Sequence, residues 1–227
     1  MIRNLKVLVA AAMALAAFGV FSASGAQAAE FHCSVENCVG VLKPDEVANT
    51  KTSHHVFIVE NAAKTESVSF TCGQLSGKSK TTAKTSTTQE AGNSTALAYS
   101  ECFVNGSGAT TVDMNGCKYN FTAAGTVTIT GCTNAAKQIE VTIANCTFDI
   151  PEQGPLSTIS YHNIGTSPNR EVTVSTNVTG IKVTAATGTK ANCFINPEQT
   201  LTGTYTTGNT IVTGQTEAGV MADAWWE

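Results

Sequence analysis

Hydrophobic and polar residues alternate along much of the chain. Several short segments place an apolar side chain at every second position, with Thr, Ser or a charged residue between. Alternation with a period of two is typical of a β-strand that buries one face. The segments are residues 68–72, 127–130, 139–143, 172–175, 181–184 and 201–205. They predict an all-β protein in which antiparallel strands bury one face against an opposing sheet.

Turn signals separate these segments. Asn115-Gly116 tolerates positive φ at both residues and predicts a hairpin corner. Residues 78–95 contain no apolar side chain larger than Ala, so we expect an exposed strand pair or a long loop there. No amphipathic helix longer than a single turn, at residues 45–49, is indicated.

The start of the chain has the order of parts of a secretion signal. Arg3 and Lys6 give a positive start, residues 7–21 are almost wholly apolar, and Ala-Gln-Ala at 26–28 matches a signal-peptidase site. An uncleaved anchor is the alternative, but the apolar run is shorter than the roughly 20 residues needed to span a bilayer. We therefore expect cleavage after Ala28, a secreted protein, and no stable membrane insertion.

These observations give an expected domain plan. Residues 1–28 form the signal, residues 29–113 an N-terminal β region and residues 114–227 a C-terminal β region. The two β regions form either one continuous domain or two packed subdomains. We predict an antiparallel β-sandwich, of jelly-roll or immunoglobulin-like type, that disulfides hold together.

Composition supports this class and narrows the partners. The chain has 35 threonines and 19 glycines, and only 13% of its residues are charged, which favours strands joined by tight turns. The net charge is −4, and loss of Arg3 and Lys6 with the signal makes it more negative. An acidic protein is a poor partner for nucleic acid or anionic membranes. We expect an extracellular glycan or protein as the partner, and no nucleic acid.

Eight cysteines all follow the predicted signal, which indicates an oxidising compartment and up to four disulfides. They are Cys33, Cys38, Cys72, Cys102, Cys117, Cys132, Cys146 and Cys193. About a hundred pairings are possible, so the sequence leaves the connectivity open. We favour sequential pairing, because a hairpin at Gly125 would bring Cys117 and Cys132 side by side. Closing a loop of that length is worth about 3 kcal/mol.

One cluster has residues suited to acid–base or metal chemistry. His54 and His55 follow the acidic residues 45–46, and histidine both titrates near neutral pH and ligates metals. Cys33 and Cys38 could add zinc ligands, but their spacing is not Cys-x2-Cys. A strand start with one histidine exposed and one packed is the more ordinary interpretation. We predict no metal, no cofactor and no catalytic residue.

Other candidates are weaker. No Gly-x-Ser-x-Gly, His-Glu-x-x-His or Gly-x-Gly-x-x-Gly motif occurs. Carboxylates that hydrolyse glycans lie about 5 to 9 Å apart, and sequence spacing does not show convergence. The candidates are Glu60, Glu66, Glu101, Asp113, Glu140, Asp149, Glu152 and Glu171. His162 is expected to face solvent. Trp225 and Trp226 should point to opposite faces of a strand, one closing the core and one exposed.

A set of spaced landmarks covers roughly residues 56–226. It consists of Cys72, Tyr99-x-x-Cys102, Asn115-Gly116-Cys117-x-Tyr119-x-Phe121, Cys146-x-x-x-Ile150-Pro151-x-Gln153-x-x-Leu156, Tyr161-x-Asn163 and Cys193. This set resembles a group of small secreted, β-rich proteins found in many copies in soil-dwelling high-GC bacteria. The resemblance implies secretion, a β fold and paired cysteines, and adds no reaction. Cys33 and Cys38 lie outside the pattern, so their pairing has the least support.

Two functional classes follow. The first is a secreted, non-enzymatic β-sandwich protein that binds a glycan, a protein or another ligand outside the cell. The second is a secreted hydrolase of extracellular polymers that uses the carboxylates or His54 and His55. A disulfide-rich protease inhibitor would need residues 78–95 as its reactive loop.

Overall fold

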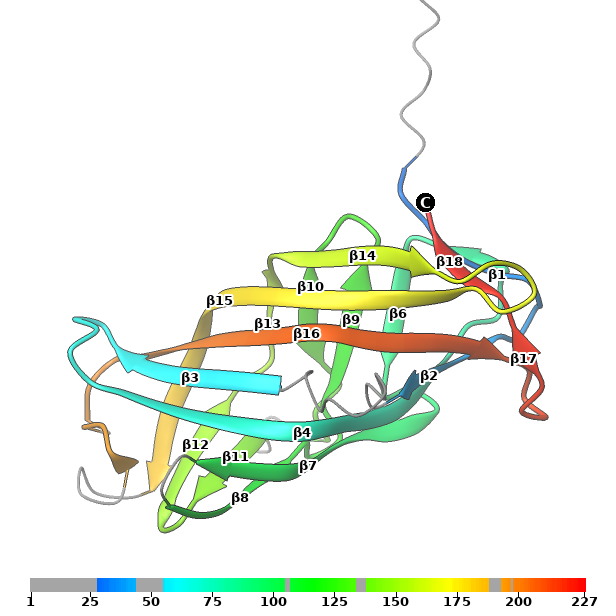
Figure 1. The fold of residues 1–227 in the computed structure, drawn as a ribbon. Helices are drawn as coiled ribbons and strands as arrows, with labels where there is room; N and C mark the ends of the chain where they lie inside the picture. The colour runs from blue at the N-terminus through cyan, green and yellow to red at the C-terminus, as the bar shows by residue number, and fades with distance from the viewer. Residues whose placement is uncertain (1–27, 44–54, 105–106, 134–137, 188–192, 197) are drawn as a thin grey trace, which may run out of the picture.

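The computed structural model shows an antiparallel β protein (Figure 1). It describes residues 28–43, 55–104, 107–133, 138–187, 193–196 and 198–227. The predicted all-β class is confirmed, because the elements of the described residues are strands. Every strand pairing is antiparallel. Within the described residues, no helix has the length and apolar character required to cross a membrane.

At one end of the molecule, eight strands close into a ring. Each pairs with the next, and the last pairs with the first. In ring order they are β15 (Glu171–Thr187), β16 (Leu201–Gln215), β3 (His55–Asn61), β4 (Ser67–Lys80), β7 (Thr95–Val104), β8 (Ser107–Asp113), β11 (Ile139–Ile143) and β12 (Cys146–Ile150). We name this part the ring half.

At the other end the ring opens into two facing layers, which we name the sandwich half. One layer continues β15, β16 and β4 and adds β14 (Ile159–Ile164), β2 (Val39–Lys43) and β17 (Met221–Ala222). The other layer is a four-stranded sheet in the order β13 (Gln153–Leu156), β10 (Val127–Thr130), β9 (Lys118–Thr122) and β6 (Thr88–Ala91). Figure 1 shows this sheet behind β14, β15 and β16. The predicted antiparallel sandwich matches this half. The closed ring of the other half was not predicted from the sequence.

Two irregularities in the β15–β16 ladder separate the halves. The register shifts between Val174 and Thr176, and again between Val178 and Ile181. Gly180, beside the second shift, has a φ of 72°. Because a bulge bends a strand, β15 turns away from β14 and continues to its partner β12 (Figure 1). The two strands predicted here are therefore one long strand.

The predicted turn residues adopt the expected positive φ angles, but not every predicted turn connects a hairpin. Asn115 and Gly116 have φ values of 47° and 78°. Their turn is no hairpin, however, because β8 and β9 do not pair with each other; it carries the chain between layers. The hairpin expected at Gly125 does form, between β9 and β10, and its glycine has a φ of 87°.

Residues 78–95 are more buried than their composition suggested. They comprise the end of β4, the short strand β5 (Thr85–Ser86) and β6. Most of their side chains reach solvent, but Ser79 and Ala91 are each only 5% exposed. The expectation of an exposed segment was wrong at these positions because small side chains, too, can face a core.

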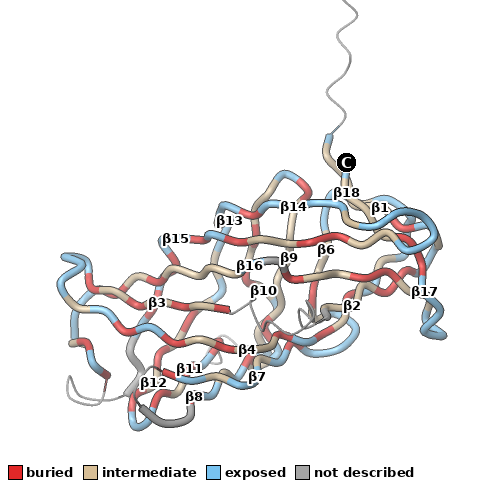
Figure 2. Tube along the Cα trace, viewed as in Figure 1, coloured by how far each residue is buried: buried red, intermediate tan, exposed pale blue. Residues whose placement is uncertain are grey.

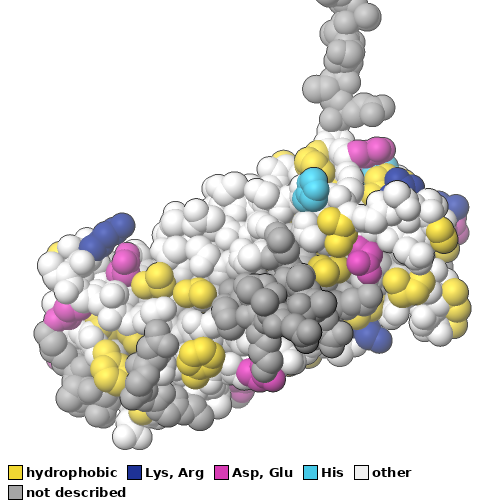
Figure 3. Space-filling view, viewed as in Figure 1, with side chains coloured by type: hydrophobic (Ala, Val, Ile, Leu, Met, Phe, Trp, Pro, Cys, Tyr) yellow, Lys and Arg dark blue, Asp and Glu magenta, His cyan; other side chains and the backbone are white. Residues whose placement is uncertain are grey.

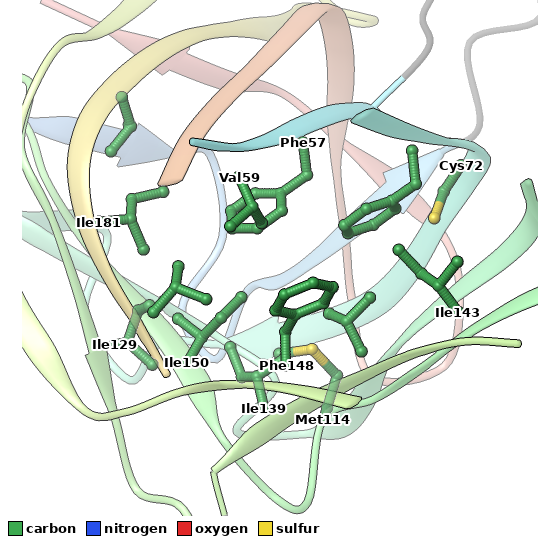
Figure 4. Close-up of a cluster of buried hydrophobic side chains, with 14 of the residues drawn as sticks. Phe57, Val59, Cys72, Met114, Ile129, Ile139, Ile143, Phe148, Ile150 and Ile181 are labelled. Atoms are coloured by element: carbon green, nitrogen blue, oxygen red, sulfur yellow. The ribbon is translucent and has the colours of Figure 1, made fainter. Parts of the chain in front are cut away.

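Large apolar side chains converge in the ring half. Figure 4 shows Phe57 and Val59 from β3 facing Phe148, Ile139 and Ile150 from β11 and β12. Figure 2 shows buried residues alternating with intermediate or exposed ones along the strands, as the period of two requires. The core cluster draws on residues both before and after residue 113, such as Val59 and Phe148.

Four disulfides staple the fold, and they pair sequentially as favoured from the sequence. They are Cys33–Cys38, Cys72–Cys102, Cys117–Cys132 and Cys146–Cys193. Four disulfides indicate an oxidising environment. The predicted signal, up to residue 27, lies outside the described residues.

Candidate ligand-binding cavity

The interior of the molecule contains a cavity of about 180 Å³ between the two layers. Its wall is mostly apolar and comes from both sheets. On β2, β15 and β16 the apolar lining residues include Leu42, Val172, Val174 and Val212; on the opposite sheet they include Phe121, Val127, Ile129 and Leu156. Alternation explains this arrangement, because every second residue of each strand points inward.

Three small residues, Gly40, Ser79 and Gly214, are among those that line the cavity. A Cβ atom at Gly214 would lie 2.7 Å from the Ala222 carbonyl oxygen, and one at Gly40 would lie 2.6 Å from Ser79 Oγ. These close approaches require glycine or a shift of the neighbour, so the cavity depends on the backbone packing around it.

A chain of hydrogen bonds joins the two layers across the cavity. The Tyr205 hydroxyl lies 2.6 Å from His55 Nδ1 and accepts a hydrogen bond from Tyr99 at 3.2 Å. The Tyr99 hydroxyl also lies 3.1 Å from that of Tyr119, on the opposite sheet. Burial raises the pKa of all three tyrosines, so they remain protonated at neutral pH.

This chain satisfies its own polar atoms. Because Tyr99 donates to Tyr205, the Tyr205 hydrogen is left for His55 Nδ1. The histidine is 5% exposed and begins β3. Such a fully bonded network fixes the spacing of the two layers. The cavity lining continues from it into the ring half, at Phe57, Phe70 and Val141.

A small sheet closes the far end of the cavity. It consists of β1 (Phe31–Cys33), β5 and β18 (Ala224–Trp226), and we name it the end sheet. Phe31, His32 and Trp225 of this sheet line the cavity. Trp225 stacks on the His32 ring at 5.0 Å, and the Arg170 guanidinium lies 4.3 Å from its ring centre.

The end sheet is also tied to the β14–β15 hairpin. Asn163 exchanges two hydrogen bonds with the Trp226 backbone, at 2.7 and 2.8 Å. Trp226 packs on Tyr161 and donates its ring N–H to the Ala123 carbonyl at 3.0 Å. Both tryptophans are half-buried, so the expectation that one would be exposed was wrong. A strand that closes the end of a sandwich has neighbours on both faces.

The structure separates the residues of the predicted histidine cluster. His54 and the acidic residues 45–46 lie outside the described residues, whereas His55 belongs to the tyrosine chain. His162 is exposed, as predicted. In the part of the chain that the structure describes, no three His, Cys, Asp or Glu side chains are grouped to hold a metal ion. Cys33 and Cys38 form a disulfide.

Three of the candidate carboxylates come together. Glu140 on β11 lies directly opposite both Asp113 on β8 and Asp149 on β12. Partial burial, and then the negative charge of Glu140, raise the pKa of Asp149. Asp113 and Glu140 are exposed, so this row lies on the outer surface of the ring half, away from the cavity.

The other carboxylates lie apart from this row. Glu66 accepts a hydrogen bond from the Asn196 backbone at 3.0 Å, and Glu152 accepts one from the Cys132 backbone at 2.8 Å. Glu60 pairs with Lys64 at 3.9 Å. Glu101 and Glu171 lie on β7 and β15. On the face in Figure 3, charged side chains are few and scattered, which leaves the interior as the most distinctive feature.

The tyrosines that line the cavity were not predicted from the sequence. All four tyrosines of the chain, Tyr99, Tyr119, Tyr161 and Tyr205, line the cavity. The alternation contains a signal for two of them. Tyr99 is two residues from the inward Leu97, and Tyr119 is two residues from Phe121, so each shares a strand face with an inward residue. The pairing of distant strands, which alternation does not encode, brings these side chains together.

No protein-family model, curated protein or solved structure matches this chain. The resemblance to secreted proteins of soil bacteria therefore stays a prediction.

Proposed function

We propose that this is a secreted, non-enzymatic binding protein whose ligand occupies the cavity between the two layers. The observation that carries the proposal is the cavity itself, about 180 Å³ with mostly apolar walls. Concave, apolar sites with a few polar groups are where proteins bind small molecules. The four disulfides and the predicted signal support export.

An apolar small molecule suits the site better than a glycan does. A sugar needs several polar partners, whereas the tyrosine chain across this cavity already satisfies its own hydrogen bonds. A glycan or protein partner would have to bind the outer surface. We propose that the ligand binds in the interior; a glycan or protein bound to the outer surface would contradict this.

The test uses the exported protein with its disulfides intact. We expect naphthalene to bind with a stoichiometry of one and to be recovered unchanged, measured by calorimetry and native mass spectrometry. Val212→Phe places a ring in the cavity and should abolish binding; Thr184→Phe places the same ring on an exposed position of β15 and should not. Failure to bind, or binding that survives Val212→Phe, would contradict the proposal.

A hydrolase is the second candidate, and the carboxylate row favours it. Side chains directly opposite on paired strands have Cβ atoms about 5 Å apart, which is near the separation in retaining glycosidases. The raised pKa of Asp149 would suit a general acid beside the Glu140 carboxylate. Turnover of an extracellular polymer that is lost in both Glu140→Gln and Asp149→Asn would favour this candidate over the first.

A further inference from the structure

Two described residues that line the cavity, His32 and Thr176, have a buried side-chain polar atom without a hydrogen bond. Thr176 Oγ1 is buried and forms no hydrogen bond, and the residue is 9% exposed. It lines the cavity from β15, next to Thr207 on β16. An unpaired buried hydroxyl costs free energy, so a hydroxyl in this apolar wall calls for an explanation, and a hydrogen bond to a bound ligand would supply one.

The neighbouring polar groups are occupied by one another. Thr207 and Thr210 place their hydroxyl oxygens 3.2 Å apart, and Gln89 donates to Ser79 Oγ at 2.5 Å. At the end sheet, His32 Nε2 forms no hydrogen bond, but it lies 3.2 Å from the Glu227 carboxylate and so has an ion-pair partner. Thr176 is thus the wall position at which a ligand can gain a hydrogen bond without breaking one.

The wall also defines the charge of the ligand. No Asp, Glu or Arg occurs among the described lining residues, and Lys84 is exposed and lies at the end sheet. A charged group placed beside Thr176 would lose its hydration without gaining an opposite charge, which is costly. The ligand at this position is therefore uncharged.

Size sets the third limit. An engineered cavity of about 150 Å³ in another protein binds benzene. At about 180 Å³, this cavity has room for a compact molecule somewhat larger than that.

We propose that the cavity binds a compact, uncharged, largely apolar alcohol or phenol, and that Thr176 hydrogen-bonds its hydroxyl group. This inference rests on the proposed function and deepens it by naming the ligand class. A hydroxyl suits the site because Thr176 can either donate to it or accept from it.

The test compares 1-naphthol with naphthalene, which differ by one hydroxyl, in calorimetric titrations of the exported protein. Thr176→Val removes the hydroxyl and keeps the shape of the side chain. We expect the ratio of 1-naphthol to naphthalene affinity to fall about 3- to 10-fold in this variant, the effect of one hydrogen bond. Naphthalene affinity should not fall. Thr184→Val, an exposed position on the same strand, should leave the ratio unchanged.

The outcomes separate the two proposals. If neither compound binds, the cavity is not a ligand site and both proposals fail. If both bind but Thr176→Val leaves their ratio unchanged, the cavity is a ligand site and the role of Thr176 is refuted. Because Thr176 loses no hydrogen bond within the protein, Thr176→Val should fold; a denaturation midpoint equal to or above that of the parent checks this.

Discussion

The ring half and the sandwich half share strands and alternation but differ in their interiors. In the ring half, inward residues such as Val59 and Phe148 are fully buried. In the sandwich half, Leu42 and Val174 line the cavity and are half-buried, whereas Val127 and Val172 line it and are buried. The cavity also extends into the ring half, where Phe57, Phe70 and Val141 line it, so only the part of the ring around Val59 and Phe148 has a solid core.

This difference has an energetic meaning. Buried apolar side chains that touch neighbours on all sides supply most of the stability of a fold, whereas a cavity wall forfeits contacts on one side. The ring half should therefore hold the fold together, and the sandwich half should tolerate changes that alter binding.

The largest expected difference in stability is between removal of two of the disulfides. Removing Cys146–Cys193, which closes a 47-residue separation in the core, should cost about 4 kcal/mol by the chain-entropy model, and lost packing adds to this. Removing Cys33–Cys38, with a separation of 5 beside the cavity, should cost about 2 kcal/mol. Urea denaturation of the paired Cys→Ala variants measures both. Equal losses would remove this distinction between the halves.

A matched pair of phenylalanines tests the interiors directly. Phe148→Ala, in the ring half, should lower the free energy of unfolding by about 4 kcal/mol. Phe121→Ala, in the cavity wall, should cost about half as much, because the side chain is already half-buried and faces open space. Denaturation midpoints that shift equally would show that the sandwich half is packed as tightly as the ring half.

A larger side chain should lower stability at a packed position and lower ligand binding at a cavity position. Val59→Phe overfills a fully buried position and should cost about 2 kcal/mol. Val212→Phe enters the cavity and should cost less than about 1 kcal/mol while abolishing naphthalene binding. Thermal melts with and without naphthalene measure both effects. A strongly destabilised Val212→Phe protein would mean that the cavity does not accept a ring.

The smallest effect concerns the outer face of the ring half. The folded state raises the pKa of Asp149, so it binds this proton more tightly than the unfolded chain and loses stability as pH rises through that range. Asp149→Asn should therefore stabilise the protein at pH 7, by about 0.5 kcal/mol or less given solvent screening, and have no effect near pH 2. Unfolding curves at both pH values test this, and destabilisation at pH 7 would refute it.

Local patterns in the sequence predict part of this structure. Alternation identifies β10, β11 and the first residues of β16, and the position of Gly125 predicts both a hairpin and the Cys117–Cys132 disulfide. These features succeed because their causes are local: side-chain parity and a glycine that adopts positive φ.

The ring and the cavity depend on contacts that alternation does not encode. Ring closure requires β12 to pair with β15, and Gly180 forms a bulge where a strand end was expected. The tyrosine chain joins residues 150 and 106 positions apart, as in His55 to Tyr205 and Tyr99 to Tyr205. Thr176 has the same residue type as many exposed threonines, and only the folded structure distinguishes it.

The most direct test is a crystal structure of the disulfide-bonded protein under xenon pressure, because xenon enters apolar cavities without needing a specific contact. We predict a xenon site against Val174 and Val212, on the cavity side of their sheet, in the parent protein, and none in Val212→Phe. A parent interior that excludes xenon, with side chains or ordered water filling the space, would contradict the claim that the sandwich half is built around an apolar ligand site.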